Sequence, residues 1–123
     1  MTEAFRYAKK SNVSDEIQYP YVSANIKVPN CDKSRRNKGK FIVSSYKTLF
    51  VQPSKDKLYK PLLERVKIGP AAVALNDTLL IHYKKGIFNH RSCITTINHA
   101  AVLIGNDNKG NWILQNYWDK NWG

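Results

Sequence analysis

A histidine and an asparagine stand at the two ends of a predicted β-hairpin near the C-terminus. In the stretch NHAAVLIGNDNKGNWILQNYW, His99 opens the first apolar run and Asn116 closes the second. An asparagine carbonyl can accept a hydrogen bond from one imidazole nitrogen and turn the other nitrogen toward a reacting group. The two residues are therefore candidates for the acid–base half of a Cys-His-Asn catalytic site.

The two apolar runs must bring these residues together. They predict strands near residues 99–105 and 111–116, joined by a turn rich in Asn, Asp and Gly. If Gly105 pairs with Asn111, the outer ends of the strands meet and the two candidate side chains become close neighbours. The same spacing also allows a hydrogen-bonded strand-end histidine beside an unrelated asparagine.

The rest of the sequence predicts two helices and further strands. Thr2 to Lys10 predicts a short helix with Thr2 as its N-cap. Helical spacing over Ser54–Lys67 is interrupted by Pro61, so the second helix can begin there, with proline in its first turn. Other strands are predicted at residues 40–50, 71–75 and 86–89. A helix followed by antiparallel strands indicates an α+β fold, here with an antiparallel sheet or partial barrel and an open edge.

Length and composition indicate a folded domain. The chain has 123 residues, of which 42% are hydrophobic and 11% aromatic, and such a composition argues for a core rather than disorder. No apolar run approaches the roughly 18 residues of a membrane span. The N-terminal MTEAFRYAKK also lacks the apolar block of a signal peptide. We therefore predict no membrane span.

Positive charge is concentrated in one predicted loop. The net charge is +11 and the sequence pI about 9.8, which makes nucleic acid a partner to consider. Between residues 27 and 40 a single acid, Asp32, stands among six cations: Lys27, Lys33, Arg35, Arg36, Lys38 and Lys40. No aromatic residue interleaves these cations as a stacking platform requires. A solvated loop is the preferred interpretation, and no nucleic-acid partner is expected.

The sequence also offers candidate residues for metal binding and for a second nucleophile. His90, Cys93 and His99 offer three metal ligands within ten residues, but their spacing lacks a fourth ligand and matches no common zinc pattern. We predict no metal and no cofactor. Cys93 precedes His99 by only six residues, and nothing beside it indicates a helix N-terminus that would activate a thiolate. It is disfavoured as a nucleophile.

Several stretches together resemble the papain family of cysteine peptidases over essentially the whole chain. They are EAFRYAKK followed by YPY, then IGPAAVAL, YKKGIF, INHAAVLIG and WILQNYWDKNWG. Each is weak alone, but their order and separations are specific. The resemblance implies cysteine endopeptidase activity by acyl transfer on a peptide or protein substrate. It also implies a secreted, lysosomal or vacuolar parent protein.

The resemblance assigns roles to five residues. His99 resembles the catalytic histidine, Asn116 the asparagine that orients it, and Trp118 the tryptophan that shields their hydrogen bond from water. Ala74 and Ala100 match positions that line the pocket for the substrate side chain two residues before the cleaved bond. Small residues there imply a roomy apolar pocket.

The departures from the family pattern are informative. The nucleophile signature C-G-[SA]-C-[WY] is absent, and the oxyanion glutamine precedes the matching region. The usual Asn-Ser-Trp-Gly is Asn116-Tyr117-Trp118-Asp119, which puts the tightness of that turn in doubt. Cys31 and Cys93 resemble halves of two different disulfides whose partners lie outside the chain.

These departures lead to the expectation of an incomplete papain-like domain over residues 1–123. Residues 1–10 would be a helix of the first lobe and about 20–123 the second, β-rich lobe. The missing N-terminal lobe of the same protein is then the expected partner, and the chain alone is expected to be inactive. The alternative is a non-catalytic papain-like homologue that acts as a binding module.

Overall fold

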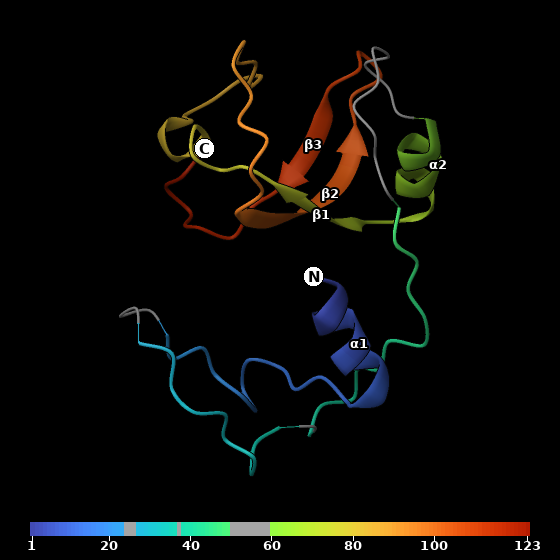
Figure 1. Cartoon of the computed structure of the whole chain (residues 1–123), viewed down its shortest axis with the longest axis vertical. Helices are drawn as coiled ribbons and strands as arrows, with labels where there is room; N and C mark the ends of the chain where they lie inside the picture. Colours follow the sequence, from blue (N-terminus) through green and yellow to red (C-terminus); the bar gives the residue numbers. More distant parts are fainter. Residues whose placement is uncertain (24–26, 37, 50–59) are drawn as a thin grey trace. The chain divides into compact units, whose positions relative to one another are not determined.

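The chain forms two compact units, Met1–Thr48 and Leu49–Gly123, which are described separately. The computed structural model describes residues 1–23, 27–36, 38–49 and 60–123 (Figure 1). Within these ranges no helix is long and apolar enough to cross a membrane. The division into a helix of one lobe at 1–10 and a second lobe from about residue 20 stays a prediction.

Helix α1, Thr2–Lys10, confirms the first predicted helix. Its N-cap is Met1, and no side chain caps it, so the prediction of Thr2 as N-cap was wrong by one position. Glu3 in its first turn and Lys9 and Lys10 in its last turn complement the helix dipole, which compensates for the missing side-chain cap.

The segment after the basic loop packs on α1 instead of forming the predicted strand. Only Phe41 makes a bridge, to Val13, and residues 42–49 are in no strand. The amide of Val43 donates to the carbonyl of Ala8 at 3.3 Å, and Ala8 is buried. The Tyr46 ring also stacks on Phe5 of the helix at 5.7 Å, whereas Phe41 and Ile42 are exposed. Residue 50 lies outside the described residues.

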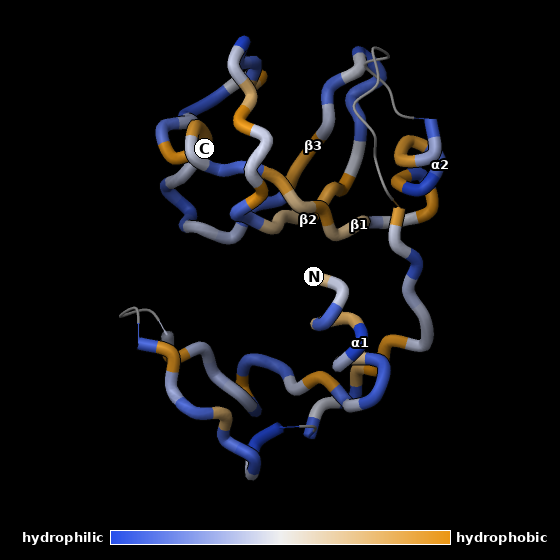
Figure 2. Tube along the Cα trace, viewed as in Figure 1, coloured by the Kyte–Doolittle hydropathy of each residue, from blue (hydrophilic) through white to orange (hydrophobic). Residues whose placement is uncertain are grey.

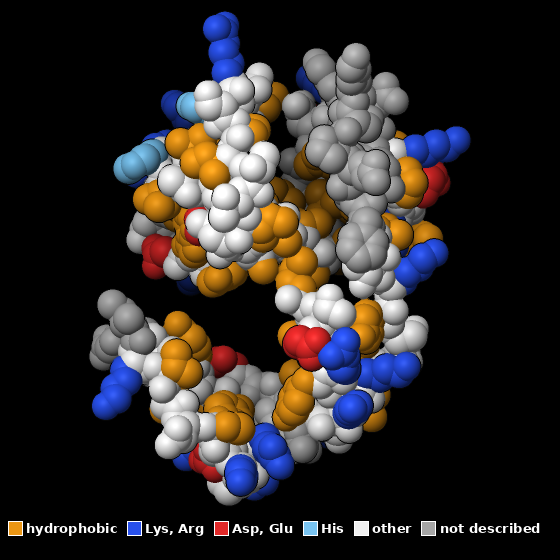
Figure 3. Space-filling view, viewed as in Figure 1, with side chains coloured by type: hydrophobic (Ala, Val, Ile, Leu, Met, Phe, Trp, Pro, Cys, Tyr) orange, Lys and Arg blue, Asp and Glu red, His pale blue; other side chains and the backbone are white. Residues whose placement is uncertain are grey.

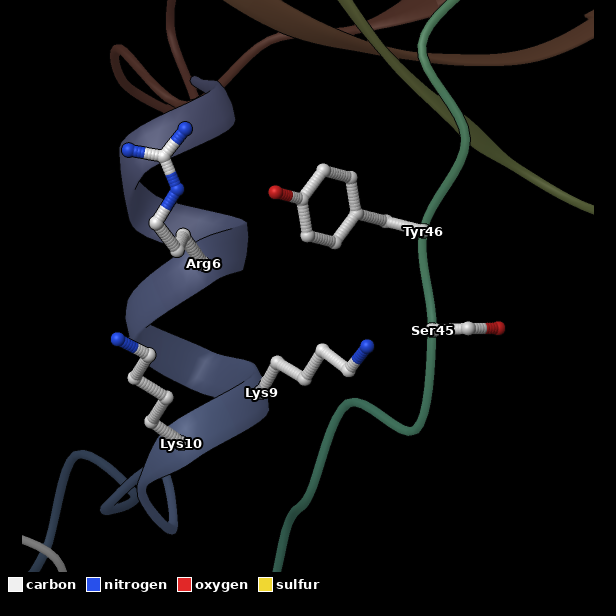
Figure 4. A pocket seen from close by; sticks show the side chains of 5 residues that line it. All are labelled: Arg6, Lys9, Lys10, Ser45 and Tyr46. Atoms are coloured by element: carbon white, nitrogen blue, oxygen red, sulfur yellow. The ribbon is translucent and has the colours of Figure 1, made fainter.

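A hollow of about 580 Å³ lies between α1 and this segment. Its lining residues are Arg6, Lys9, Lys10, Ser45 and Tyr46. Figure 4 shows Lys9 reaching toward Ser45 while Lys10 points away from it. The cationic groups do not converge on one point, so the hollow lacks the geometry of a formed anion site.

The basic loop is exposed and locally hydrogen-bonded. The six cations predicted to lie there are all exposed. Asp32 accepts hydrogen bonds from the hydroxyl and the amide of Ser34 and pairs with Arg35 at 3.2 Å. These contacts, the Ser34 hydrogen bonds first, hold the pKa of Asp32 below its ordinary value. The only acid of the loop is thus used to order its turn.

The second unit is built on a three-stranded antiparallel sheet. The strand order is β1-β2-β3, with β1 at Ala71–Leu75, β2 at His99–Asn106 and β3 at Trp112–Gln115. The sheet is not closed, and with the two helices it makes an α+β fold, as predicted. Strand β1 confirms the strand expected at residues 71–75.

Helix α2, Lys60–Ile68, packs against β2 (Figure 1). Pro61 stands in its first turn, where its missing N–H costs no intrahelical hydrogen bond. The helix predicted in this stretch is confirmed, but its start near Pro61 stays a prediction. The earlier start at Ser54, the other possibility in that helical stretch, lies outside the described residues.

The β2–β3 hairpin has a different register from the predicted one. Gly105 pairs with Ile113, not with Asn111, and Val102 pairs with Gln115. The register shifts between Leu103 and Gly105, which is a β-bulge or irregularity that sequence periodicity does not reveal. The turn between the strands, residues 107–111, is as long as predicted but lies one position later in the sequence.

Strand β2 alternates between a buried and an exposed face. His99, Ala101 and Leu103 are buried, and Leu103 is only 1% exposed. Val102 and Ile104 on the other face are exposed. Figure 2 shows hydrophobic residues concentrated in α2 and the strands, and Figure 3 shows Lys and Arg projecting from the edges of this unit. The buried face of β2 is therefore the core that carries His99.

The predicted strand at residues 86–89 does not form. Gly86 has φ 82°, a left-handed conformation that interrupts an extended run. The Tyr83 hydroxyl donates to the Gly86 carbonyl at 2.5 Å, and the Tyr83 ring contacts Phe88 edge-on. The segment is a loop closed by its own side chains. The short 3₁₀ helix η1, Leu80–His82, precedes it.

Candidate active site

His99 and Asn116 are hydrogen-bonded to each other. The distance from His99 Nε2 to Asn116 Oδ1 is 3.0 Å, which confirms the predicted proximity. His99 begins β2, and Asn116 follows the last residue of β3, so the hairpin brings the two side chains together. The His99 side chain is 5% exposed. The pair is therefore largely withdrawn from water.

The contacts of Asn116 determine which nitrogen of His99 donates. Asn116 Oδ1 also accepts a hydrogen bond from the backbone N–H of Tyr117 at 3.0 Å. Because that N–H can only donate, the atom that His99 faces is the carbonyl oxygen. Nε2 of His99 therefore carries a proton, and Nδ1 is the nitrogen that can gain or lose one. The amide nitrogen of Asn116 is buried without a hydrogen-bond partner among the described residues.

Two aromatic rings contact the imidazole. Trp118 is tilted against it with ring centroids 5.1 Å apart, and Tyr117 is stacked on it at 5.4 Å. Trp118 meets Trp122 edge-on at 5.0 Å, and the Trp122 indole N–H donates to the Leu80 carbonyl at 3.0 Å. Trp118 is thus fixed by a second tryptophan anchored to η1. It contacts His99, as expected of a shielding residue.

Ala74 and Ala100, predicted to line a substrate pocket, are paired in the β1–β2 ladder. They stand one position from the Leu75–His99 pair. Both are exposed, whereas His99 is on the buried side of β2. The two alanines therefore share one face of the sheet, opposite the face that holds His99.

Cys93, the cysteine in the same unit as His99, does not contact the imidazole. Cys31 and Cys93 are both free and exposed. The sulfur of Cys93 lies 3.7 Å from the His90 carbonyl oxygen, in the loop that precedes β2. Among the described residues no group of three or more His, Cys, Asp or Glu side chains could hold a metal ion. The set His90, Cys93 and His99 is accordingly not gathered into a site.

Sequence reasoning missed the residues on the other side of the imidazole. Oδ2 of Asp77 lies 3.5 Å from His99 Nδ1. Asn98 holds this carboxylate, because its side-chain N–H donates to Asp77 Oδ1 at 2.7 Å. The available signal was the pairing of β1 with β2: an antiparallel partner places the residues after Leu75 beside those that precede His99.

Comparison with known proteins shows which protein family the chain resembles. A profile of the papain family of cysteine proteases matches residues 1–123. Cysteine proteinase B of Leishmania mexicana is 31% identical, over 100% of this chain and 28% of that protein. The putative cathepsin L 3 of Paramecium tetraurelia is also 31% identical, over 98% and 35%. Cathepsin S of Rattus norvegicus is 29% identical, over 100% and 37%.

The fold, the His–Asn pair and these relatives together indicate a cysteine-type peptidase class. The chain belongs to the papain family of cysteine proteases, whose profile covers it from end to end. It spans between 28% and 37% of the length of the three relatives just described.

Proposed function

We propose that this chain carries the acid–base half of a papain-like cysteine peptidase site. His99 is the base and acid, Asn116 orients it, and Trp118 shields their hydrogen bond. The observation that carries the proposal is the 3.0 Å hydrogen bond between buried His99 Nε2 and Asn116 Oδ1. A hydrogen bond in a site with little water is stronger than the same bond in solvent.

The proposed chemistry uses Nδ1 of His99, because Nε2 is committed to Asn116. Nδ1 accepts the proton of a cysteine thiol, and the thiolate attacks the carbonyl carbon of the substrate peptide bond. The C–N bond breaks as Nδ1–H protonates the leaving amine, and a thioester remains on the cysteine. Water then hydrolyses the thioester with His99 again acting as base.

The nucleophile is proposed to come from a lobe that this sequence does not contain. Cys93 contacts the His90 carbonyl and not His99, and within the described part of the second unit the His99 ring contacts Asn116, Asp77, Tyr117 and Trp118. We therefore infer that the 123-residue chain alone has no peptidase turnover. Its partner would be the cysteine-bearing N-terminal lobe of the same protein.

The substrate would be a peptide or protein, and one of its side chains would lie over the exposed face of the sheet. Ala74 and Ala100 offer methyl groups side by side on that face, next to exposed Val102. Small apolar side chains leave room for a large apolar group of the substrate. Similarity to cathepsins supports a secreted, lysosomal or vacuolar parent protein. In such an oxidising compartment, disulfides from Cys31 and Cys93 to partners beyond this chain are part of the proposal.

A non-catalytic homologue that binds peptides is the competing function, and one experiment separates the two. The purified chain is assayed on a broad peptide library, alone and together with a segment that carries the family's cysteine signature. We expect turnover only in the two-piece sample, and its loss on His99→Gln. Peptide binding without turnover in that sample would support the binding module. Turnover by the chain alone that disappears on Cys93→Ser would show that Cys93 is the nucleophile.

A further inference from the structure

A carboxylate faces the reactive nitrogen of His99. Oδ2 of Asp77 lies 3.5 Å from Nδ1, and the two side chains are 20% and 5% exposed. Asp77 stands two residues after β1, outside the hairpin that supplies His99 and Asn116. The imidazole therefore lies between an amide oxygen on one edge and a carboxylate oxygen on the other.

Asp77 is held by two hydrogen bonds to the Asn98 side chain, one through its carboxylate and one through its backbone. Asn98 donates to Asp77 Oδ1 at 2.7 Å and accepts the backbone N–H of Asp77 at 3.0 Å. Asn98 is itself held because its backbone N–H donates to the Leu75 carbonyl at 3.2 Å. The Asp77 carboxylate cannot turn away from His99 without breaking its bond from Asn98, and the other bond holds the Asp77 backbone in place.

The charge on this carboxylate acts on the protonation of Nδ1. With Nε2 donating to Asn116, a neutral His99 presents the Nδ1 lone pair to a carboxylate oxygen, and the two repel. A doubly protonated His99 presents an N–H and a positive charge to the same oxygen, and the two attract. Because the imidazole is almost fully buried, water screens this interaction little.

We propose that Asp77 is a positioning residue that serves as a built-in counter-ion and favours the doubly protonated form of His99. Within the described residues of the second unit, the titratable groups against the imidazole are Asp77 and Tyr117, and Tyr117 stacks on its face. Asp77 is thus the acidic group at its edge. The catalytic consequence rests on the proposed function. In the peptidase, Asp77 would keep His99 doubly protonated and so able to protonate the leaving amine.

The test reads the ring nitrogens of His99 directly in the 123-residue chain. Ring ¹⁵N chemical shifts report which nitrogens are protonated, and the His99 signals are assigned by their loss in His99→Gln. Asp77→Asn keeps an acceptor for Asn98 but removes the charge. Glu64→Gln is the matched control, because it removes one negative charge from an exposed side chain on α2.

We expect the ratio of doubly to singly protonated His99 at neutral pH to fall about tenfold or more in Asp77→Asn, as is typical when an opposite charge within roughly 4–6 Å is removed. Glu64→Gln should leave the ratio unchanged. Asp77→Ser is the second variant, and unchanged amide spectra of β2 show that each variant is folded. An unchanged ratio in both folded Asp77 variants would overturn the proposal. This readout needs no turnover, so it can fail while the proposed peptidase function stands.

Discussion

The side chains of His99 and Asn116 meet at 3.0 Å although the residues are seventeen positions apart in the sequence. The hairpin between them crosses a register shift, yet its ends still converge. The pair therefore depends on the irregular β2–β3 ladder. Substitution of Asn116 or of Trp118, whose ring contacts the imidazole, tests the hydrogen bond between the two side chains.

Asn116→Ala should release the imidazole from one tautomer. The carbonyl oxygen that keeps the proton on Nε2 is lost, so we expect the singly protonated population of His99 to divide between the two tautomers. Ring ¹⁵N chemical shifts measure this directly. Asn89→Ala, in the exposed loop before β2, is the control and should change nothing. A single Nε2–H tautomer in Asn116→Ala would show that another group sets the tautomer.

Leu103→Ala should destabilise the second unit strongly. Leu103 is 1% exposed at the centre of the sheet, paired with Ala71 on one side and Leu114 on the other. Loss of a buried leucine side chain costs about 2–5 kcal/mol of the free energy of unfolding. Ile104→Ala is the neighbouring control, because that side chain is 45% exposed, and it should cost less than about 1 kcal/mol. Urea unfolding compares the two, and equal losses would contradict the assignment of the core.

Much of this fold was readable from local patterns. The helix at α1, the proline in the first turn of α2, the strand β1 and the two strands of the hairpin each follow from residue type and spacing within one segment. The convergence of His99 and Asn116 was also predictable, because a hairpin needs only its own turn to bring its ends together.

The sequence-based predictions that were wrong or missing concern contacts between segments that are distant in the sequence. The run that begins at Phe41 has strand-forming residues, but it packs on α1 because, within the part of the chain that the structure describes, only Val13 offers a ladder partner. The bulge in β2 is a property of pairing, which residue alternation does not encode. Asp77 was missed for the same reason: its place beside His99 follows from the β1–β2 ladder and not from any motif.

Asp107 should make the stability of the β2–β3 hairpin depend on pH. Its carboxylate accepts hydrogen bonds from the side chain and backbone of Asn111 and the amide of Lys109. These bonds, the side chain of Asn111 first, lower the pKa of Asp107 below its ordinary 3.8. A lowered folded-state pKa gives stability that is present above the unfolded value and is lost as pH falls through the folded value.

Unfolding followed by denaturant at several pH values tests this sign. Wild type should lose stability as pH falls below about 3.8, and Asp107→Asn should lose less over the same interval because it has no carboxylate to protonate. Parallel pH profiles for the two proteins would mean that the turn does not depend on the ionised carboxylate.

Gly39→Ala should break the β-bridge between Val13 and Phe41 in the first unit. A Cβ at this position would lie 1.6 Å from the carbonyl oxygen of Val13, so the backbone must move. Val13 donates its N–H to the Phe41 carbonyl at 2.8 Å. We expect faster hydrogen exchange of the Val13 amide in the variant. Gly69→Ala, where the nearest atom is the end of Arg65 at 3.9 Å, should leave that amide protected.

Trp118→Ala should expose the His99–Asn116 hydrogen bond to water. The Trp118 ring lies 5.1 Å from the imidazole and is supported by Trp122, whereas the Tyr117 ring, at 5.4 Å, is 75% exposed and already in contact with solvent. Loss of the supported ring should therefore admit water, and loss of the exposed ring should not. The measurement is the exchange rate of the His99 Nε2 proton with water. We expect this rate to rise about tenfold in Trp118→Ala, which corresponds to about 1.4 kcal/mol of lost protection. Tyr117→Ala should change it little, and a larger effect in Tyr117→Ala would identify tyrosine as the ring that excludes water.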